Sequence, residues 1–280
     1  MKADLLVTTE KLARHLGDAQ WVIFDSRHDL VDANKGRNAY EAGHIPGAYF
    51  ISLDRDLSGP KTGKTGRHPL PAPEGFVATM NRFGINPGMQ IVIYDDTQGS
   101  YAGRLFWMLR WIGQDKVALL DGGIPKWIKE GRAISKDVPA ERVGSIVARP
   151  GLGATVDVHF VDRFKESGEI TLIDARAPSR FAGEGETLDP VGGHIPGAVN
   201  RFWQKNLNAD GTFKSPEMLR TEFRELLGGA DASKVVHSCG SGVTACHNAF
   251  AMELAGLPTG RLYPGSWSEW CADPARAVAR

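Results

Sequence analysis

Short apolar runs alternate with helical stretches along the whole chain. The apolar runs fall at 21–25, 91–94, 117–120, 170–174, 235–238 and 261–263. Helical stretches with an apolar period near 3.6 residues fall at 104–112, 221–227 and 245–254. Buried strands that alternate with helices predict an α/β fold, in which a mostly parallel sheet has helices on both faces.

The second half of the chain repeats motifs of the first half in the same order. An Asp-x-Arg motif starts at Asp25 and again at Asp174. A Gly-His-Ile-Pro-Gly-Ala motif starts at Gly43 and again at Gly193. Two copies of this length indicate a duplicated domain and not a solenoid.

The stretch between the two copies is rich in proline and glycine and has no clear period, which is typical of a linker. We therefore expect two similar domains. The predicted boundaries are 1–135 for the N-terminal domain, 136–155 for the linker and 156–280 for the C-terminal domain.

The loop Cys239-Gly240-Ser241-Gly242-Val243-Thr244 joins a predicted strand to a predicted helix. Two glycines let the backbone curl so that several N–H groups point at one atom, and the helix N-terminus adds unpaired donors. Such a turn stabilises an anion and favours Cys239 as a reactive thiolate. Most free cysteines are inert packing residues, which is what we expect of Cys246 and Cys271.

The first copy has Asp95 at the position of Cys239, in a loop that is one residue longer. A carboxylate cannot carry out sulfur chemistry. The nucleophile is therefore expected only in the C-terminal half, and the N-terminal domain is expected to be non-catalytic.

Composition narrows the function classes. The 33 basic and 33 acidic residues balance, which argues against a nucleic-acid or membrane-surface partner. No apolar run approaches the roughly 18 residues of a membrane span, and residues 1–11 lack a signal-peptide core. Three cysteines without a CxxC pair or metal-ligand spacing fit a reducing cytoplasm, and we expect no metal or organic cofactor.

The paired motifs and the cysteine loop together resemble the tandem-domain rhodanese superfamily. The loop looks like that of the 3-mercaptopyruvate sulfurtransferase branch, whereas the thiosulfate branch typically has two basic residues after the cysteine. The resemblance implies two rhodanese-like domains and a persulfide on Cys239. It also implies a small anionic sulfur donor and a thiol acceptor, either a small thiol or a thioredoxin-like protein, with cyanide as a test-tube acceptor.

The resemblance also implies roles for single residues. Arg180 matches an arginine that holds the carboxylate or sulfonate of the donor. Asp54 and His68 match an acid and a histidine that are proposed to act with the loop serine, Ser241. The remaining loop residues would bind the sulfur through their amides: Gly240, Gly242, Val243 and Thr244. The repeated residues are expected to be structural: His44, His194, Arg27 and Arg176.

One position departs from the branch. A second substrate arginine is usual shortly before the second Gly-His-Ile-Pro-Gly motif, and here Asp189 stands near that position. An acidic residue is not expected to help bind an anion. The choice between 3-mercaptopyruvate and thiosulfate as donor therefore stays open.

Two functions of other classes were weighed. Cysteine phosphatases use a Cys-x5-Arg loop, and here Ala245 stands where the phosphate-binding arginine would be. A catalytically silent binding module is the second alternative, and the retention of Cys239 in its glycine loop argues against it.

Overall fold

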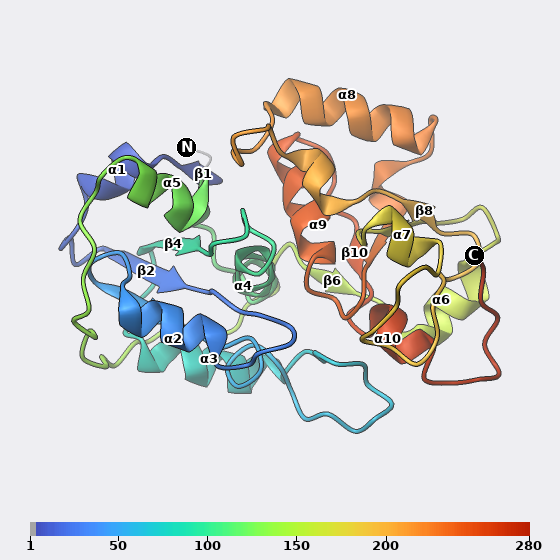
Figure 1. The fold of residues 1–280 in the computed structure, drawn as a ribbon, viewed down its shortest axis with the longest axis horizontal. Coiled ribbons are helices and arrows are strands. Elements are labelled where there is room, and N and C mark those ends of the chain that lie inside the picture. The colour runs from blue at the N-terminus through green and yellow to red at the C-terminus, as the bar shows by residue number, and fades with distance from the viewer. Residues whose placement is uncertain (1–3) are drawn as a thin grey trace. The chain divides into compact units, whose positions relative to one another are not determined.

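The computed structural model describes residues 4–280 as two compact units (Figure 1). The first unit comprises residues 4–58, 71–152 and 209–213. The second unit comprises residues 59–70, 153–208 and 214–280. The short segment 59–70 therefore belongs to the second unit, although it precedes most of that unit by some 80 residues in sequence.

The first unit contains one five-stranded sheet in the order β1-β5-β4-β2-β3, and all of its strand pairs are parallel. Its strands are β1 (Leu6–Val7), β2 (Trp21–Asp25), β3 (Ala48–Phe50), β4 (Gln90–Tyr94) and β5 (Val117–Leu120). Its helices are α1 (Thr9–Ala13), α2 (Lys35–Ala42), α3 (Pro73–Arg82), α4 (Ala102–Trp111) and α5 (Gly123–Lys129).

The second unit repeats this topology with the order β6-β10-β9-β7-β8, again all parallel. Its strands are β6 (Ala154–Thr155), β7 (Thr171–Asp174), β8 (Val199–Asn200), β9 (Val235–Ser238) and β10 (Arg261–Leu262). Its α-helices are α6 (Val158–Phe164), α7 (Pro178–Phe181), α8 (Pro216–Leu227), α9 (Ala245–Leu254) and α10 (Ser266–Trp270). Two 3₁₀ turns complete it, η1 (Trp203–Asn206) and η2 (Ala232–Lys234). The predicted α/β fold of two similar domains is confirmed.

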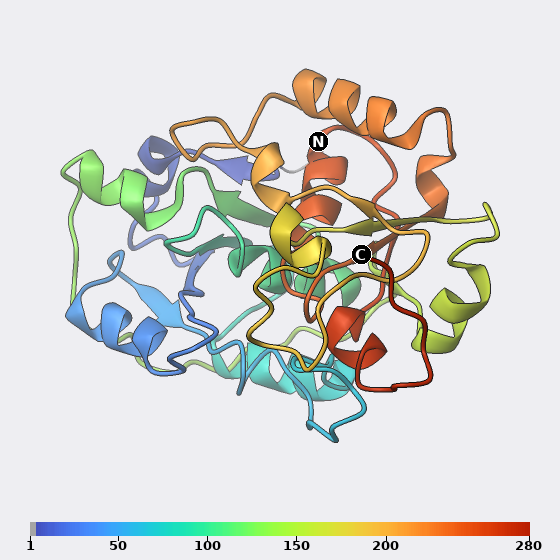
Figure 2. The same cartoon turned by 45° about the vertical axis from the view of Figure 1, so that its right-hand side comes forward.

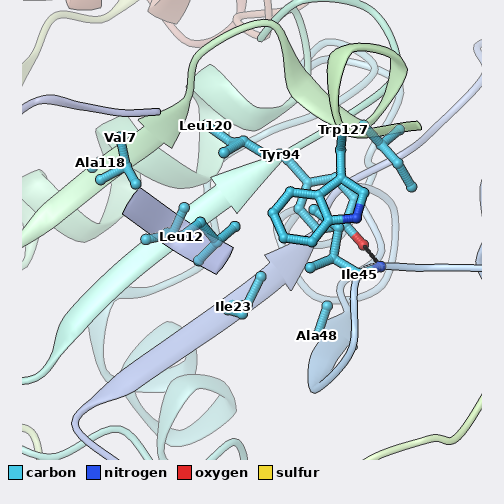
Figure 3. Close-up of a cluster of buried hydrophobic side chains, with 11 residues drawn as sticks. Val7, Leu12, Ile23, Ile45, Ala48, Tyr94, Ala118, Leu120 and Trp127 are labelled. Carbon is cyan, nitrogen blue, oxygen red and sulfur yellow. Dashed lines mark hydrogen bonds between the residues drawn. The ribbon is translucent and has the colours of Figure 1, made fainter. Parts of the chain in front are cut away.

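The core of the first unit packs helices against alternate residues of the sheet (Figure 3). Trp127 of α5 is fully buried there beside Tyr94 of β4. The Tyr94 hydroxyl accepts a bond from the Ile45 N–H at 3.1 Å and donates to Asp25 at 2.9 Å. This hydroxyl thus connects the first Gly-His-Ile-Pro-Gly turn to the ends of the two central strands.

The second unit has helices on both faces of its sheet, and adjacent strand residues show this directly. Leu172 and Val236 pack in one cluster with the tryptophans of α10, whereas Ile173 and Val235 pack in another with apolar residues of α8 and α9. Figures 1 and 2 show α8 and α9 on one side of this sheet and α6 and α10 on the other. No helix within residues 4–280 combines the length and apolar character that crossing a membrane requires.

The repeated arginines are structural in both units. Arg27 pairs with Asp25 at 2.6 Å and donates to the Gly43 carbonyl at 2.8 Å. Arg176 pairs with Asp174 at 2.8 Å and donates to the corresponding carbonyl, that of Gly193, at 2.7 Å. Each arginine therefore fastens the end of a central strand to a Gly-His-Ile-Pro-Gly turn, as the repeat predicts.

The repeated histidines close the same turns. His44 stacks on Tyr40 at 3.9 Å, and its Nδ1 lies 2.8 Å from the Tyr40 carbonyl. His194 stacks on Phe181 at 3.7 Å, and its Nδ1 lies 2.8 Å from the Phe181 carbonyl. Both side chains hold backbone, which agrees with the structural role expected from their repetition.

Candidate active site

Cys239 is the first residue after β9, at the carboxyl end of the second sheet, and its side chain is buried. Ligands of parallel α/β sheets bind beyond this end of the strands. Three hydrogen bonds fix the cysteine: its N–H donates to Ser266 Oγ at 3.1 Å, and its carbonyl accepts from Trp267 at 3.0 Å. The Gly240 carbonyl accepts from Ser268 at 2.9 Å. The start of α10 thus holds the backbone from which the thiol projects.

Gly242 has a backbone conformation that requires glycine. Its φ is +74°, and a Cβ at this position would lie 2.4 Å from the Pro264 carbonyl oxygen. The loop therefore packs tightly against the segment that precedes α10. Val243 is buried, and the carbonyls of Val243 and Thr244 accept the N–H groups of Cys246 and His247 at 3.1 Å. These two residues close the turn into α9, which begins at Ala245 as predicted.

The corresponding turn of the first unit shows what its backbone N–H groups do. Asp95 follows β4 as Cys239 follows β9, and it is fully buried. Four N–H groups donate to its carboxylate at 2.8–2.9 Å, those of Thr97, Gly99, Tyr101 and Ala102. Burial raises the pKa of Asp95, and these four bonds oppose the rise. The duplicated turn is therefore an anion cradle, which the first unit fills with its own carboxylate.

Three arginines approach the loop of the second unit at Gly240. A Cβ on Gly240 would lie 2.8 Å from Arg67 Nη2, 3.8 Å from Arg180 Nη1 and 3.9 Å from Arg176 Cδ. Burial disfavours the charged form of Arg176, but Asp174, the Cys239 sulfur and Glu186 together raise the pKa of its guanidinium. The residue beside the cysteine thus faces positive charge, which suits an anionic donor.

Glu186 holds Arg180 in position, and sequence analysis did not identify it. Arg180 donates through Nε and Nη2 to the Glu186 carboxylate at 2.8–3.1 Å, which leaves Nη1 on the side of Gly240. Burial opposes the ionised form of Glu186, but the Leu188 N–H and Arg180 lower its pKa overall. The carboxylate therefore stays charged and orients the guanidinium.

Asp189 is not a bare negative charge at the site. Its Oδ1 forms an ion pair with Arg67 Nη1, and its Oδ2 lies 3.6 Å from Arg180 Nη2. Burial raises the pKa of Asp189, and the Arg67 guanidinium opposes this rise. The expectation that an acid here does not help to bind an anion overlooked these two arginines. Nothing in the local sequence around Arg67 indicates its partner, which lies 122 positions away.

His68 and Ser241 are brought together inside the second unit. Nδ1 of His68 lies 2.8 Å from Ser241 Oγ in a hydrogen bond, and both side chains are buried. Asp54 belongs to the first unit, where its Oδ2 lies 4.0 Å from His28 Nε2. A role for Asp54 together with His68 and Ser241 stays a prediction.

The other two cysteines lie away from this chemistry. Cys246 is fully buried in α9, and its thiol donates to the Gly242 carbonyl at 3.4 Å. Burial, together with the negative charge of Asp189, raises the pKa of Cys271 to about 11. All three cysteines are free, and residues 4–280 contain no group of three or more His, Cys, Asp or Glu side chains arranged to hold a metal ion.

Known proteins resemble this chain over its whole length. The Rhodanese-like domain pattern matches residues 8–130 and again 158–273. A Pseudomonas aeruginosa protein named "Probable 3-mercaptopyruvate sulfurtransferase" is 43% identical over 281 residues, covering 100% of this chain and 99% of that protein. Mouse thiosulfate sulfurtransferase is 34% identical, covering 90% of this chain and 83% of its own. An Escherichia coli crystal structure, whose description concerns the rhodanese fold and 3-mercaptopyruvate sulfotransferases, is 31% identical with a TM-score of 0.79, covering 95% of this chain and 99% of its own.

Proposed function

The chain belongs to the rhodanese family, and from this premise we propose that it is a sulfurtransferase that carries a sulfur atom as a persulfide on Cys239. One observation carries the proposal. The same turn occurs twice, and its anion position is occupied by Asp95 in the first unit and offered to Cys239 in the second. The first unit is therefore the non-catalytic copy.

The first half-reaction loads the cysteine. The Cys239 thiolate attacks the sulfur of 3-mercaptopyruvate, so an S–S bond forms and the C–S bond breaks. The electron pair of the broken bond passes to carbon, and the leaving group is the enolate of pyruvate. One proton moves from the donor thiol to the enolate carbon, which gives pyruvate and leaves the persulfide anion in the cradle.

The His68–Ser241 pair favours 3-mercaptopyruvate as the donor. An enolate needs a proton carrier, and a hydroxyl bonded to an imidazole two residues from the nucleophile supplies one. Thiosulfate has no such requirement, since sulfite leaves as a stable anion. Relatives of this chain carry the names of both activities, so the donor is decided by chemistry at this pair.

The second half-reaction unloads the sulfur. An acceptor thiolate attacks the outer sulfur of the persulfide, a new S–S bond forms, and Cys239 is released as thiolate. Cyanide is converted to thiocyanate in the same way. The acceptor is a small thiol or a thioredoxin-like protein, and a reducing cytoplasm keeps Cys239 free between turnovers. The two steps predict ping-pong kinetics.

Thiosulfate is the second candidate donor, because the guanidinium groups beside Gly240 also suit a sulfonate dianion. The rival phosphatase function lacks support, since Ala245 begins α9 where that reaction needs an arginine. The two donors differ in one respect that can be tested: only 3-mercaptopyruvate needs the proton carrier.

The experiment measures kcat/KM with each donor for the wild type and Ser241→Ala. We expect 3-mercaptopyruvate to be the better donor, and Ser241→Ala to lower its kcat/KM about 100-fold while changing that of thiosulfate less than about threefold. Ser238→Ala is the matched control, because its hydroxyl bonds only weakly to the Ile173 carbonyl, at 3.4 Å. A better rate with thiosulfate, or equal losses with both donors, would make thiosulfate the donor.

A further inference from the structure

A second arginine is placed at the catalytic loop by a segment that the sequence motifs do not include. We propose that Arg67 binds the carboxylate of the donor together with Arg180, and that Asp189 is the residue that positions it. This inference rests on the proposed function for the identity of the donor. The site itself needs only an anion beside Cys239.

The guanidinium of Arg67 is held on one side and open on the other. Its Nη1 is paired with Asp189, whereas its Nη2 lies 2.8 Å from the point where a Cβ of Gly240 would stand. Arg180 has the same arrangement, with Glu186 on one edge and Nη1 facing Gly240. Two oriented guanidiniums thus converge on the residue that follows the nucleophile.

Exposure separates these two arginines from the third. The side chains of Arg67 and Arg180 are 25% and 24% exposed, whereas that of Arg176 is 2% exposed and fastened to Asp174. A ligand entering from solvent can reach the first two and not the third. Arg176 therefore contributes charge from below, while Arg67 and Arg180 offer N–H groups.

The backbone that carries Arg67 is fixed in the second unit independently of Asp189. The Arg67 N–H donates to Ser268 Oγ at 3.1 Å, and Gly66 packs so closely that a Cβ would lie 2.7 Å from the Gly265 carbonyl oxygen. The next residue, His68, bonds to Ser241. The segment is thus clamped beside the loop on both sides of Arg67.

Asp189 connects the two guanidiniums. Its carboxylate pairs with Arg67 and lies 3.6 Å from Arg180, and its Oδ2 has no hydrogen-bond partner within residues 4–280. An arginine at position 189 would stand between two other cations. The charges are therefore exchanged in this chain: position 67 supplies the cation, and position 189 supplies the acid that orients it.

One competing role must be separated from binding. Arg67 could serve only to neutralise Asp189, whose unpaired charge would repel a donor. The double variant Arg67→Ala/Asp189→Asn removes both charges and distinguishes the two roles. Arg67→Lys keeps the charge without the fork and reports on folding as well as on geometry.

The first test needs no sulfur transfer. Cys239 is alkylated with iodoacetate, which is anionic, and with iodoacetamide, which is neutral and of similar size, and the ratio of the two rates at Cys239 is read by peptide mass spectrometry. Arg67→Ala should lower this ratio about tenfold, whereas Arg224→Ala, on the exposed side of α8, should leave it unchanged. An unchanged ratio in Arg67→Ala would overturn the proposal.

The second test uses turnover of 3-mercaptopyruvate by the full chain. Arg67→Ala should raise KM roughly 10- to 100-fold, Arg67→Lys should recover part of the loss, and the double variant should remain as impaired as Arg67→Ala. Wild-type KM in the double variant would show that Arg67 only neutralises Asp189, which overturns the proposal. A wild type that transfers no sulfur but shows the Arg67-dependent alkylation ratio would refute the proposed function and still support the anion site.

Discussion

Replacing Gly242 by alanine tests how the loop shapes the site. The residue has φ +74°, so any side chain there costs about 1–2 kcal/mol of left-handed strain. The new Cβ would lie 2.4 Å from the Pro264 carbonyl oxygen, which must move by about 1 Å to reach ordinary contact. Overpacking of this kind typically costs about 1–3 kcal/mol more. We therefore expect Gly242→Ala to lose about 2–5 kcal/mol in the free energy of unfolding.

The same displacement should be visible in catalysis. The carbonyl that must move lies two residues before Ser266, whose hydroxyl accepts the Cys239 N–H, so the nucleophile moves with it. A misplacement of about 1 Å can cost about 100-fold in rate. Urea denaturation and kcat with 3-mercaptopyruvate are the two measurements.

Gly228→Ala is the matched control for this substitution. Gly228 has φ +54° at the end of α8, and a Cβ there would meet nothing within 4 Å. It should lose only the strain of about 1–2 kcal/mol and keep full activity. If Gly242→Ala is no less stable than Gly228→Ala and retains wild-type kcat, the close packing of the loop does not shape the active site and our reasoning fails.

Three further outcomes follow from the same contacts and charges. Arg180→Ala should raise KM for 3-mercaptopyruvate roughly 10- to 100-fold by removing a charged hydrogen bond, and an unchanged KM would make Arg180 a surface residue. Since burial raises the pKa of Cys271 to about 11, roughly one in 3,000 of these thiols is ionised at pH 7.5, so iodoacetamide should label Cys271 far more slowly than Cys239; equal rates would contradict this. Burial lowers the pKa of His237 to about 4, so below pH 6.5 the unfolded chain binds a proton that the folded chain does not. The free energy of unfolding should therefore fall by up to about 3 kcal/mol as the pH drops from 6.5 to 4, and less so in His237→Gln; identical pH dependence of the two proteins in urea denaturation would refute this.

The central strands and the catalytic turn are predictable from the sequence because local pattern determines them. Apolar runs of four or five residues mark the three inner strands of the first unit, and the helix after Cys239 begins and ends where its pattern indicates. The edge strands were not predicted. Strands such as β1 and β6 have two residues each, which is too short for any period, and they exist only because a longer neighbour pairs with them.

The site was predictable only where a motif carries it. Cys239 and Ser241 belong to one loop, and the structure brings His68 to that loop. The ion pairs of Arg67 with Asp189 and of Arg180 with Glu186 depend on which segments meet in space, and no local pattern encodes that meeting. For this reason the sequence alone made Asp189 an obstacle to the anion, whereas its contacts make it a support for two arginines.

The most direct test of the account is to locate the transferred sulfur. The protein is incubated with 3-mercaptopyruvate without an acceptor, and intact mass is followed by peptide mapping. We expect one added sulfur, about 32 Da, on Cys239 in the wild type and in Cys246→Ser and Cys271→Ser, and none in Cys239→Ser. A folded Cys239→Ser protein that still gains the sulfur, or a wild type that carries it on Cys246 or Cys271, would contradict the account.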